Sequence, residues 1–368
     1  MKICFLSLMN GSHWGGSEEL WFRMGLWLAK QKQEVSVACY EWEGKKDRLD
    51  QLRAFGVTIH LLPRKKTLFS PFALKKAINT IPWEDYDLVF VNQGGYKEVV
   101  YPPFDQLYAR MNKYILAFHN YDETETLSEK RVVSLQQWIS NASLNVGAAG
   151  KIFDVLENNF GIHTEKKQVW PNPVTIDLPN SYSPFPGLIN GCFHWSVLAE
   201  LDLHRKAQDL LIETLASEKW RQRNWILHLY GRGKDELKIQ KLIIDNHLEE
   251  KIILEGFQKN IKQVLEQTHV LIQCTRIDAM PLSVVEAMAM SRPCLVTNIG
   301  EMPAWVENGK NGWVCNELTI AELDSMLEKC WNDRENWEEM GRNAFDTFRK
   351  KYPIPYEEEL FNRFRSIS

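Results

Sequence analysis

The feature that most constrains the fold is an alternation of short apolar runs with amphipathic helical patterns. Short buried strands that alternate with helices predict a parallel sheet covered by helices on both faces. In the first half of the chain the apolar runs, rich in β-branched and aromatic residues, are 3–8, 35–40, 57–62, 88–92, 114–118 and 143–146. Helical patterns lie between them, for example at 17–30, 73–81 and 128–140.

The alternation stops at residues 180–187, where two prolines, a glycine and two serines without periodicity predict a linker. Beyond it the apolar runs are 193–199, 225–230, 251–254, 270–274, 294–297 and 313–315, and the helical patterns are 208–217, 235–246, 261–266, 282–290 and 320–332. We therefore predict an α/β protein of two Rossmann-like doubly wound domains, 1–180 and 187–352. We expect their sheets to face each other across a cleft, with ligands beyond the carboxyl ends of the strands.

Composition narrows the functional classes. The chain has 44 Lys and Arg against 48 Asp and Glu, a formal charge of −4, which disfavours a general nucleic-acid binder. The seven cysteines are widely spaced without a C-x-x-C, so we expect reduced core thiols in a cytosolic protein. No run approaches the roughly 18 apolar residues of a membrane-spanning helix. The 14 tryptophans suggest large aromatic-lined surfaces or clefts.

Two candidate ligand contacts lie in the first half. Gly15 and Gly16 precede the first helix, where glycines allow close approach and free N–H groups attract an anion. A plain strand-to-helix turn capped by Ser17 explains them equally well. His119 follows the run 114–118, so it lies at the ligand edge of a parallel sheet. There its imidazole could donate a hydrogen bond to a substrate hydroxyl. From the position alone we favour the alternative, a hydrogen bond to the next loop.

The richest segment runs from residue 275 to 312. Asp278 precedes the helix predicted from 282, and Glu286 lies in its first turns, so both carboxylates belong to one strand–helix unit. Glu286 is placed to accept two hydrogen bonds from a sugar diol such as ribose. The alternative is that both residues are merely exposed carboxylates on an ordinary strand–loop–helix unit. The backbone N–H groups near Met280, Leu282 and Ser283 suit an anion or hydroxyls.

Two adjacent cations, Arg205 and Lys206, begin a helix after the run 193–199. A guanidinium binds a phosphate as a fork and an ammonium binds it as a point charge, so the pair suits a diphosphate in a cleft. An isolated pair of this kind is more often a solvated surface.

Taken together, these segments resemble glycosyltransferases of the GT-B fold, specifically the large retaining family 4, or glycosyltransferase group 1. The resemblance covers nearly the whole chain and is strongest in the second half. Its motifs are the Gly-Gly loop (Gly15-Gly16), a strand-end His (His119), Asn172-Pro173 before the linker, an R-x5-K-G-like loop (Glu200 to Ala207), the E-x7-E pattern (Asp278 and Glu286) and E-A-M-A-x3-P-x3-T from Glu286 to Thr297.

The resemblance implies a nucleotide-sugar donor in the second domain. Lys206 would hold its diphosphate, the backbone of Gly15 and Gly16 would approach that group from the first domain, and Glu286 would bind the ribose. The base would lie near Gly256-Phe257 and Arg276, mostly through backbone contacts. The transferred sugar would contact His119 near the reacting carbon, Asp278, and the backbone of Ala279, Met280, Pro281 and Leu282.

The resemblance also implies an acceptor in the first domain, a hydroxyl of a glycan or of a lipid-linked acceptor in polysaccharide biosynthesis. Transfer would proceed with retention, without a bound metal or other cofactor. We expect UDP as the base-bearing diphosphate, with GDP next. The C-terminal helix, 353–368, would pack back on the first domain.

Three positions depart from the family pattern. The Arg of R-x5-K-G is Glu200, which cannot bind a diphosphate, so Arg205 substitutes for it or this corner is rebuilt. The first Glu of E-x7-E is Asp278, whose reach is shorter by about one C–C bond, about 1.5 Å. The Gly that usually follows is Ala279. Two alternatives therefore stay open, a non-catalytic nucleotide-sugar-binding protein and a GT-B-fold epimerase. A dehydrogenase is disfavoured because the G-x-G-x-x-G fingerprint is absent.

Residues 51–83 contain no Asp or Glu and combine basic with aromatic side chains, which suits an anionic lipid surface or a lipid-diphosphate acceptor. A solvated face beside core aromatics is the favoured alternative. If the first interpretation holds, the protein is cytoplasmic and peripheral at the inner face of the membrane. The residues concerned are Arg53, Arg64, Lys65, Lys66, Phe69, Phe72, Lys75, Lys76 and Trp83.

Overall fold

The structure is a computed structural model that describes residues 1–11, 14–64 and 70–367. The chain forms two compact units, one of Met1–Pro173 with Pro353–Ser368 and one of Val174–Tyr352. The division at 173/174 precedes the proline-rich segment 180–187. That segment is bonded to the second unit, since Ser183 N donates to Ser291 Oγ at 3.0 Å and Tyr182 Oη donates to Asp346 Oδ1 at 2.9 Å.

The sheet of unit 1 has seven parallel strands in the order β3-β2-β1-β4-β5-β6-β7. The strands are β1 (Lys2–Ser7), β2 (Glu34–Tyr40), β3 (Thr58–Leu62), β4 (Leu88–Gln93), β5 (Tyr114–Phe118), β6 (Leu144–Gly147) and β7 (Lys167–Val169). Strands β1 to β6 coincide with the predicted apolar runs. Strand β7 was not predicted, because its three residues are exposed and mostly polar.

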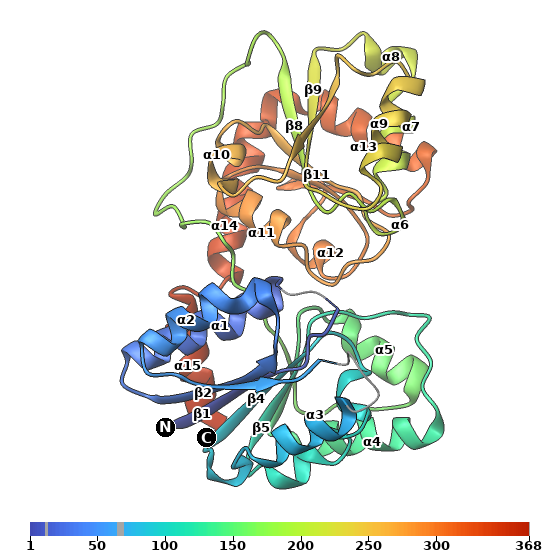
Figure 1. Cartoon of the computed structure of the whole chain (residues 1–368). Helices are drawn as coiled ribbons and strands as arrows, with labels where there is room; N and C mark the ends of the chain where they lie inside the picture. Colours follow the sequence, from blue (N-terminus) through green and yellow to red (C-terminus); the bar gives the residue numbers. More distant parts are fainter. Residues whose placement is uncertain (12–13, 65–69, 368) are drawn as a thin grey trace. The chain divides into compact units, whose positions relative to one another are not determined.

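Helices cover both faces of this sheet (Figure 1). The helices α1 (Gly16–Lys30), α2 (Lys46–Ala54) and α15 (Tyr356–Ile367) lie on one face, and α3 (Ser70–Asn79), α4 (Glu129–Asn141) and α5 (Lys151–Phe160) lie on the other. Helix α15 is fixed by Phe364, which is buried against Phe5 and Phe90 with ring centroids 6.3 and 5.7 Å away. Tyr356 Oη donates to the Pro171 carbonyl at 2.8 Å. The C-terminal helix therefore belongs to the core of unit 1.

Unit 2 repeats the same winding. Its six strands are all parallel in the order β10-β9-β8-β11-β12-β13, the 3-2-1-4-5-6 order of a doubly wound dinucleotide-binding fold. The strands are β8 (Phe193–Leu198), β9 (Trp225–Tyr230), β10 (Ile252–Gly256), β11 (Val270–Gln273), β12 (Cys294–Thr297) and β13 (Gly312–Cys315). All six were predicted, and two doubly wound parallel sheets confirm the predicted fold class.

The helices of unit 2 again divide between two faces (Figure 1). One face carries α7 (Gln208–Leu215), α9 (Glu236–Asp245) and α13 (Ile320–Asn332), and the other carries α10 (Ile261–Glu266), α11 (Leu282–Ala289) and α14 (Trp337–Lys351). The shorter helices are α6 (Leu203–Lys206), α8 (Glu218–Arg221) and α12 (Met302–Trp305). The chain leaves α14 through Pro353 and Pro355, which end the helical pattern before α15 begins.

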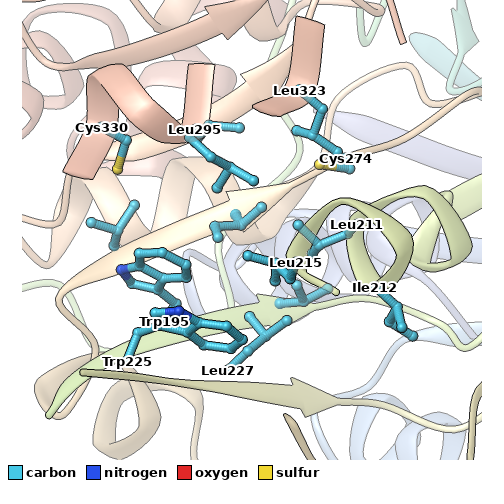
Figure 2. Close-up of a cluster of buried hydrophobic side chains, with 14 of the residues drawn as sticks. Trp195, Leu211, Ile212, Leu215, Trp225, Leu227, Cys274, Leu295, Leu323 and Cys330 are labelled. Atoms are coloured by element: carbon cyan, nitrogen blue, oxygen red, sulfur yellow. The ribbon is translucent and has the colours of Figure 1, made fainter. Parts of the chain in front are cut away.

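Most of the tryptophans pack in the hydrophobic cores, although their number had suggested aromatic-lined surfaces or clefts. Nine of the 14 are fully buried, and in unit 2 Trp195 and Trp225 stack with their rings 4° from parallel and 5.4 Å apart (Figure 2). The same cluster contains Cys274 and Cys330, and all seven cysteines are unpaired. Burial raises the pKa of Cys39 and of Cys315 to about 11, so these thiols stay protonated.

A buried ion pair fixes the start of α1 to the sheet. Glu18 and Lys45 are both fully buried, and Lys45 Nζ lies 2.5 Å from Glu18 Oε1. Glu18 also accepts from Ser7 Oγ at 2.9 Å and from Asn92 Nδ2 at 3.1 Å. Ser7 ends β1 and Asn92 lies in β4, so the carboxylate joins the two strands at which the strand order reverses.

We expect Lys45→Met to lower the free energy of unfolding by about 3–5 kcal/mol, because it leaves the Glu18 carboxylate buried without its cation. The matched control is Lys46→Met, the neighbouring exposed lysine, for which the change is expected to stay within about 0.5 kcal/mol. Urea melts followed by tryptophan fluorescence measure both. Equal effects of the two substitutions would show that the buried pair does not hold unit 1 together.

Candidate functional site

A cavity of about 340 Å³ lies at the carboxyl edge of the unit 2 sheet. The loops after three adjacent strands and the start of α11 form its wall, which is where doubly wound sheets bind their ligands. Its lining residues are Leu198 at the end of β8 with Ala199 and Glu200 after it, Tyr230 at the end of β9 with Gly231 and Arg232 after it, Phe257 and Gln258 after β10, Ile261 at the start of α10, and Ser283 and Glu286 on α11.

Two glycines shape the loops at this edge of the sheet, of which only Gly231 lines the cavity. Gly231 has φ +149°, and a Cβ there would lie 1.9 Å from the Ala199 carbonyl oxygen, so only glycine lets the loops after β8 and β9 touch. Gly256 has φ +67° at the end of β10, and a Cβ there would meet nothing within 4 Å. The first glycine closes the wall of the cavity, and the second supplies a left-handed turn.

Glu286 is the buried carboxylate of the cavity. Its Oε1 accepts from the Thr175 backbone N–H at 2.6 Å and from Thr175 Oγ1 at 2.7 Å. Burial raises the pKa of Glu286, and the two Thr175 bonds offset part of that rise. A carboxylate has about four acceptor sites, so Glu286 keeps capacity for ligand hydroxyls.

Lys206 and Asp278 form an ion pair, from Lys206 Nζ to Asp278 Oδ2. Their side chains are only 12% and 15% exposed, and they come from α6 and from the loop after β11. The predicted diphosphate-binding cation and the predicted catalytic carboxylate therefore neutralise each other in the described structure.

The two arginines of the predicted site both lie beside carboxylates. Arg276 Nη1 and Nη2 both lie 2.9 Å from the Asp209 carboxylate, so its guanidinium joins the loop after β11 to α7 and does not line the cavity. Arg205 Nη1 lies 3.9 Å from Glu200 Oε2, with both side chains exposed. Arg205 therefore lies beside Glu200, which occupies the position of the Arg in the R-x5-K-G pattern.

The loop before α11 is tightly packed. Gly300 has φ +58°, and a Cβ there would lie 2.4 Å from the Asp278 carbonyl oxygen and 2.2 Å from that of Ala279. The Ala279 carbonyl also accepts from the Glu301 backbone N–H at 2.8 Å. These contacts hold the loop that carries Asp278.

The first turn of α11 follows directly from that loop. Pro281 is its N-cap, Leu282 is its first residue, and Met280 before it is buried. Ser283 Oγ donates to Gln273 Oε1 at 3.2 Å, and Ser283 lines the cavity. Of the residues predicted to contact the donor, the cavity wall therefore contains Phe257, Ser283 and Glu286.

In unit 1 the predicted residues lie at the carboxyl edge of its own sheet. Gly15 is the N-cap of α1, Gly16 is its first residue, and a Cβ at Gly15 would meet nothing within 4 Å. His119 follows β5, and both of its ring nitrogens are buried without a hydrogen-bond partner among the described residues. Burial lowers the pKa of His119 to about 4, so the ring is neutral at pH 7.

Some site features were not predicted. Thr175 lies 111 residues before Glu286, and no sequence spacing links them. Gln93, the last residue of β4, is fully buried with both amide atoms lacking a partner among the described residues, and its carbonyl accepts from His119 N. Its position after an apolar run was the available signal.

Within the described ranges, no group of three or more His, Cys, Asp and Glu side chains is arranged to hold a metal ion. Among the same residues, no helix is both long and apolar enough to cross a bilayer. Metal independence and membrane association both stay predictions. In the basic stretch, Lys65, Lys66 and Phe69 lie outside the described residues, Phe72 is 77% exposed, and Trp83 is fully buried in the core.

Comparison with known proteins identifies the family. Residues 198–347 match the family described as glycosyl transferases group 1, and residues 14–178 match the family described as Glycosyltransferase Family 4. The two matches fall on the two sheets, and the chain belongs to the group 1 glycosyltransferases of the GT-B fold. This confirms the predicted family.

Three relatives show how far the likeness extends. A poly(ribitol-phosphate) α-N-acetylglucosaminyltransferase of Staphylococcus aureus is 28% identical over 148 residues, 40% of this chain and 30% of that protein. A UDP-Gal:α-D-GlcNAc-diphosphoundecaprenol α-1,3-galactosyltransferase of Escherichia coli is 22% identical over 82% of this chain and 80% of its own. The matches to the S. aureus protein and to a Bacillus anthracis N-acetyl-α-D-glucosaminyl L-malate synthase cover only 30% and 36% of those relatives.

Among solved structures, Anabaena HepE in complex with UDP superposes with a TM-score of 0.77 over all of both chains at 18% identity. The S. aureus TarM structure superposes with a TM-score of 0.74 over all of this chain and 98% of that chain, at 13% identity. These likenesses show the GT-B fold.

A pH titration tests the Thr175–Glu286 contact. If ionised Glu286 accepts ligand hydroxyls, UDP affinity falls as pH is lowered through the raised pKa of Glu286. Thr175→Val removes a hydrogen bond to the charged form, so we expect the midpoint of that loss to move to higher pH. Thr175→Ser keeps the hydroxyl and should leave the midpoint in place.

Calorimetric titration of UDP at several pH values measures all three proteins. The titration of the UDP phosphate is common to them and cancels in the comparison. If UDP affinity falls at the same pH in Thr175→Val and Thr175→Ser, the Thr175 hydroxyl does not set the ionisation of Glu286 at the ligand site.

Proposed function

We propose that the protein transfers a sugar from a nucleoside diphosphate sugar to a hydroxyl of a glycan or lipid-linked acceptor, with retention of configuration and without a metal. The observation that carries the proposal is Glu286, a buried carboxylate held by Thr175 in the wall of a cavity at the carboxyl edge of unit 2. Family membership supports the reaction class.

For the donor, the cavity offers complementary chemistry in one place. Glu286 would accept hydrogen bonds from the two ribose hydroxyls, while Tyr230, Phe257 and Ile261 present apolar surface to the base. Phe257 is 59% exposed and is thus available to a planar ring. We favour UDP over GDP, because the Anabaena structure contains UDP and the E. coli relative is named for UDP-Gal.

For the diphosphate, the proposal assigns Lys206, with Arg205 beside it and the N–H groups at the start of α11 nearby. Because Lys206 is paired with Asp278 in the described structure, the ammonium has to exchange that partner for phosphate oxygens. Cations and N–H dipoles aimed at the leaving group stabilise the charge that develops on it. Asp278, released from Lys206, would accept hydrogen bonds from the transferred sugar.

In the transfer step, the bond between the anomeric carbon and the diphosphate oxygen breaks, and a bond from that carbon to the acceptor oxygen forms. The acceptor's proton passes to the leaving phosphate oxygen on the same face of the sugar, which gives retention without a covalent enzyme intermediate. Neutral His119 would contact the sugar as a hydrogen-bonding group. A covalent sugar adduct on Asp278, detected by mass spectrometry, would replace this step by a double displacement.

Titration of UDP, GDP and ADP into the full chain tests the donor assignment. We expect UDP to bind, and Lys206→Ala to weaken it about tenfold or more because a charged hydrogen-bonding partner is lost. Asp278→Asn is the matched variant, since it removes the charge that competes for Lys206. It should not weaken UDP, but it should lower the rate of UDP release from a UDP-sugar.

The outcomes separate the alternatives. Nucleotide binding without sugar release from any donor would favour a non-catalytic binding protein, and conversion of the donor to an isomer of equal mass would favour an epimerase. If no nucleotide binds, or if Lys206→Ala binds UDP as tightly as the wild type, the donor assignment is wrong.

A further inference from the structure

Unit 1 has a cavity of its own, of about 270 Å³, at the carboxyl edge of its sheet. The residues that follow or end β1, β2 and β3, the loop after β4, and helix α3 supply its wall. Those that matter for its chemistry are Leu8, Tyr40, Leu74, Glu98, Tyr101 and Phe104. All of them belong to unit 1, so the cavity is complete within that unit.

Glu98 gives the cavity its polar character. The Gly95 backbone N–H donates to Glu98 Oε2 at 3.2 Å, and a Cβ at Gly94 would lie 2.8 Å from Glu98 Oε1, so the carboxylate is seated on a glycine turn. Burial raises the pKa of Glu98, partly offset by backbone N–H groups. The backbone N–H groups of Gly94, Gly95 and Glu98 use part of the roughly four acceptor sites of a carboxylate, which leaves about one for a ligand donor.

Lys97 lines the cavity, but its ammonium and the guanidinium of the neighbouring Arg64 both have other partners. Lys97 Nζ lies 2.8 Å from Glu125 Oε1, and its side chain is about half exposed. The Arg64 guanidinium lies 3.3 Å from the centroid of the Trp42 ring. Among the described residues Glu98 has no ion-pair partner, so the cavity presents an acceptor of hydrogen bonds that disfavours an anion.

The rest of the wall suits a sugar ring. Burial, and then the Glu98 charge, raise the pKa of Tyr40 to about 12, so the phenol keeps its proton and can donate a hydrogen bond. Leu8, Leu74, Tyr101 and Phe104 supply apolar and aromatic surface for C–H groups. An occupant therefore needs a hydroxyl that donates to Glu98, an oxygen that accepts from Tyr40, and an apolar face.

We propose that Glu98 and Tyr40 are specificity residues: where the acceptor enters this cavity, they select a neutral sugar or polyol over one that carries a phosphate ester. The inference rests on the proposed function, because it assigns the second substrate of that reaction. Glu98 is a binding and specificity residue here, and the transfer step does not use it as a base.

The experiment measures UDP release from UDP-glucose, UDP-galactose and UDP-N-acetylglucosamine by the full chain. The acceptor probes are glucose, galactose, N-acetylglucosamine and ribitol, each beside its phosphate ester. We expect at least one neutral probe to stimulate UDP release and its phosphate ester to stimulate it less. Stimulation by phosphate esters alone, or by no neutral probe, would overturn the inference.

Two variants test the residues. Glu98→Gln keeps an oxygen for the Gly95 N–H but loses the charge, so we expect KM for the neutral probe to rise about tenfold. The preference for the neutral probe over its phosphate ester should also shrink, which a purely structural role would not cause. Tyr40→Phe removes one hydroxyl and should raise the same KM. An unchanged KM and an unchanged preference in both variants would refute the assignment.

The matched control is Glu129→Gln, an exposed carboxylate in the first turn of α4 outside the cavity, which should behave as the wild type. UDP titration of each variant separates a failure of this inference from a failure of the proposed function. If UDP binds normally while the acceptor results fail, the inference is wrong and the proposed function stands. If no nucleotide binds to the wild type, both fail.

Discussion

Each of the two sheets is built only from parallel strands, and the rest of the molecule depends on that constraint. Every strand then ends at the same edge, so residues far apart in the chain meet in the loops beyond it. In unit 2 this convergence puts Glu200, Gly231 and Glu286 around one cavity. In unit 1 it brings Tyr40 and Glu98 together in the same way.

Buried charge is handled by local pairing in both units. Glu18 has Lys45, Asp278 has Lys206, and Glu286 has the hydroxyl and the backbone N–H of Thr175. The first pair is fully buried and joins α1 to the sheet, whereas the second lies where a loop meets α6 and is the pair to which the proposed function assigns the diphosphate and the sugar. The same physical requirement, a partner for each desolvated charge, is met in both places.

The sequence predicted the fold well because the strands are continuous apolar runs. Strand β7 was not predicted, because its residues are exposed and mostly polar and form no apolar run. The boundary between the units lies before the proline-rich segment, because that segment is hydrogen-bonded to unit 2. At the site, Glu286 was predicted from its place in the first turns of a helix that follows an apolar strand, and it does line the cavity. Its partner Thr175 was not, because a contact across 111 residues leaves no local pattern. The contact between Arg276 and Asp209 could not be predicted either, because it depends on how α7 packs.

The central claim is that the carboxyl edge of unit 2 binds a nucleoside diphosphate. Hydrogen exchange of the full chain with and without UDP tests it most directly, because it reports protection along the backbone without assuming a reaction. The account predicts slowed exchange in residues 198–206, 230–233, 256–258 and 278–286. UDP binding that slows exchange only in other segments and leaves these four unchanged would contradict the account.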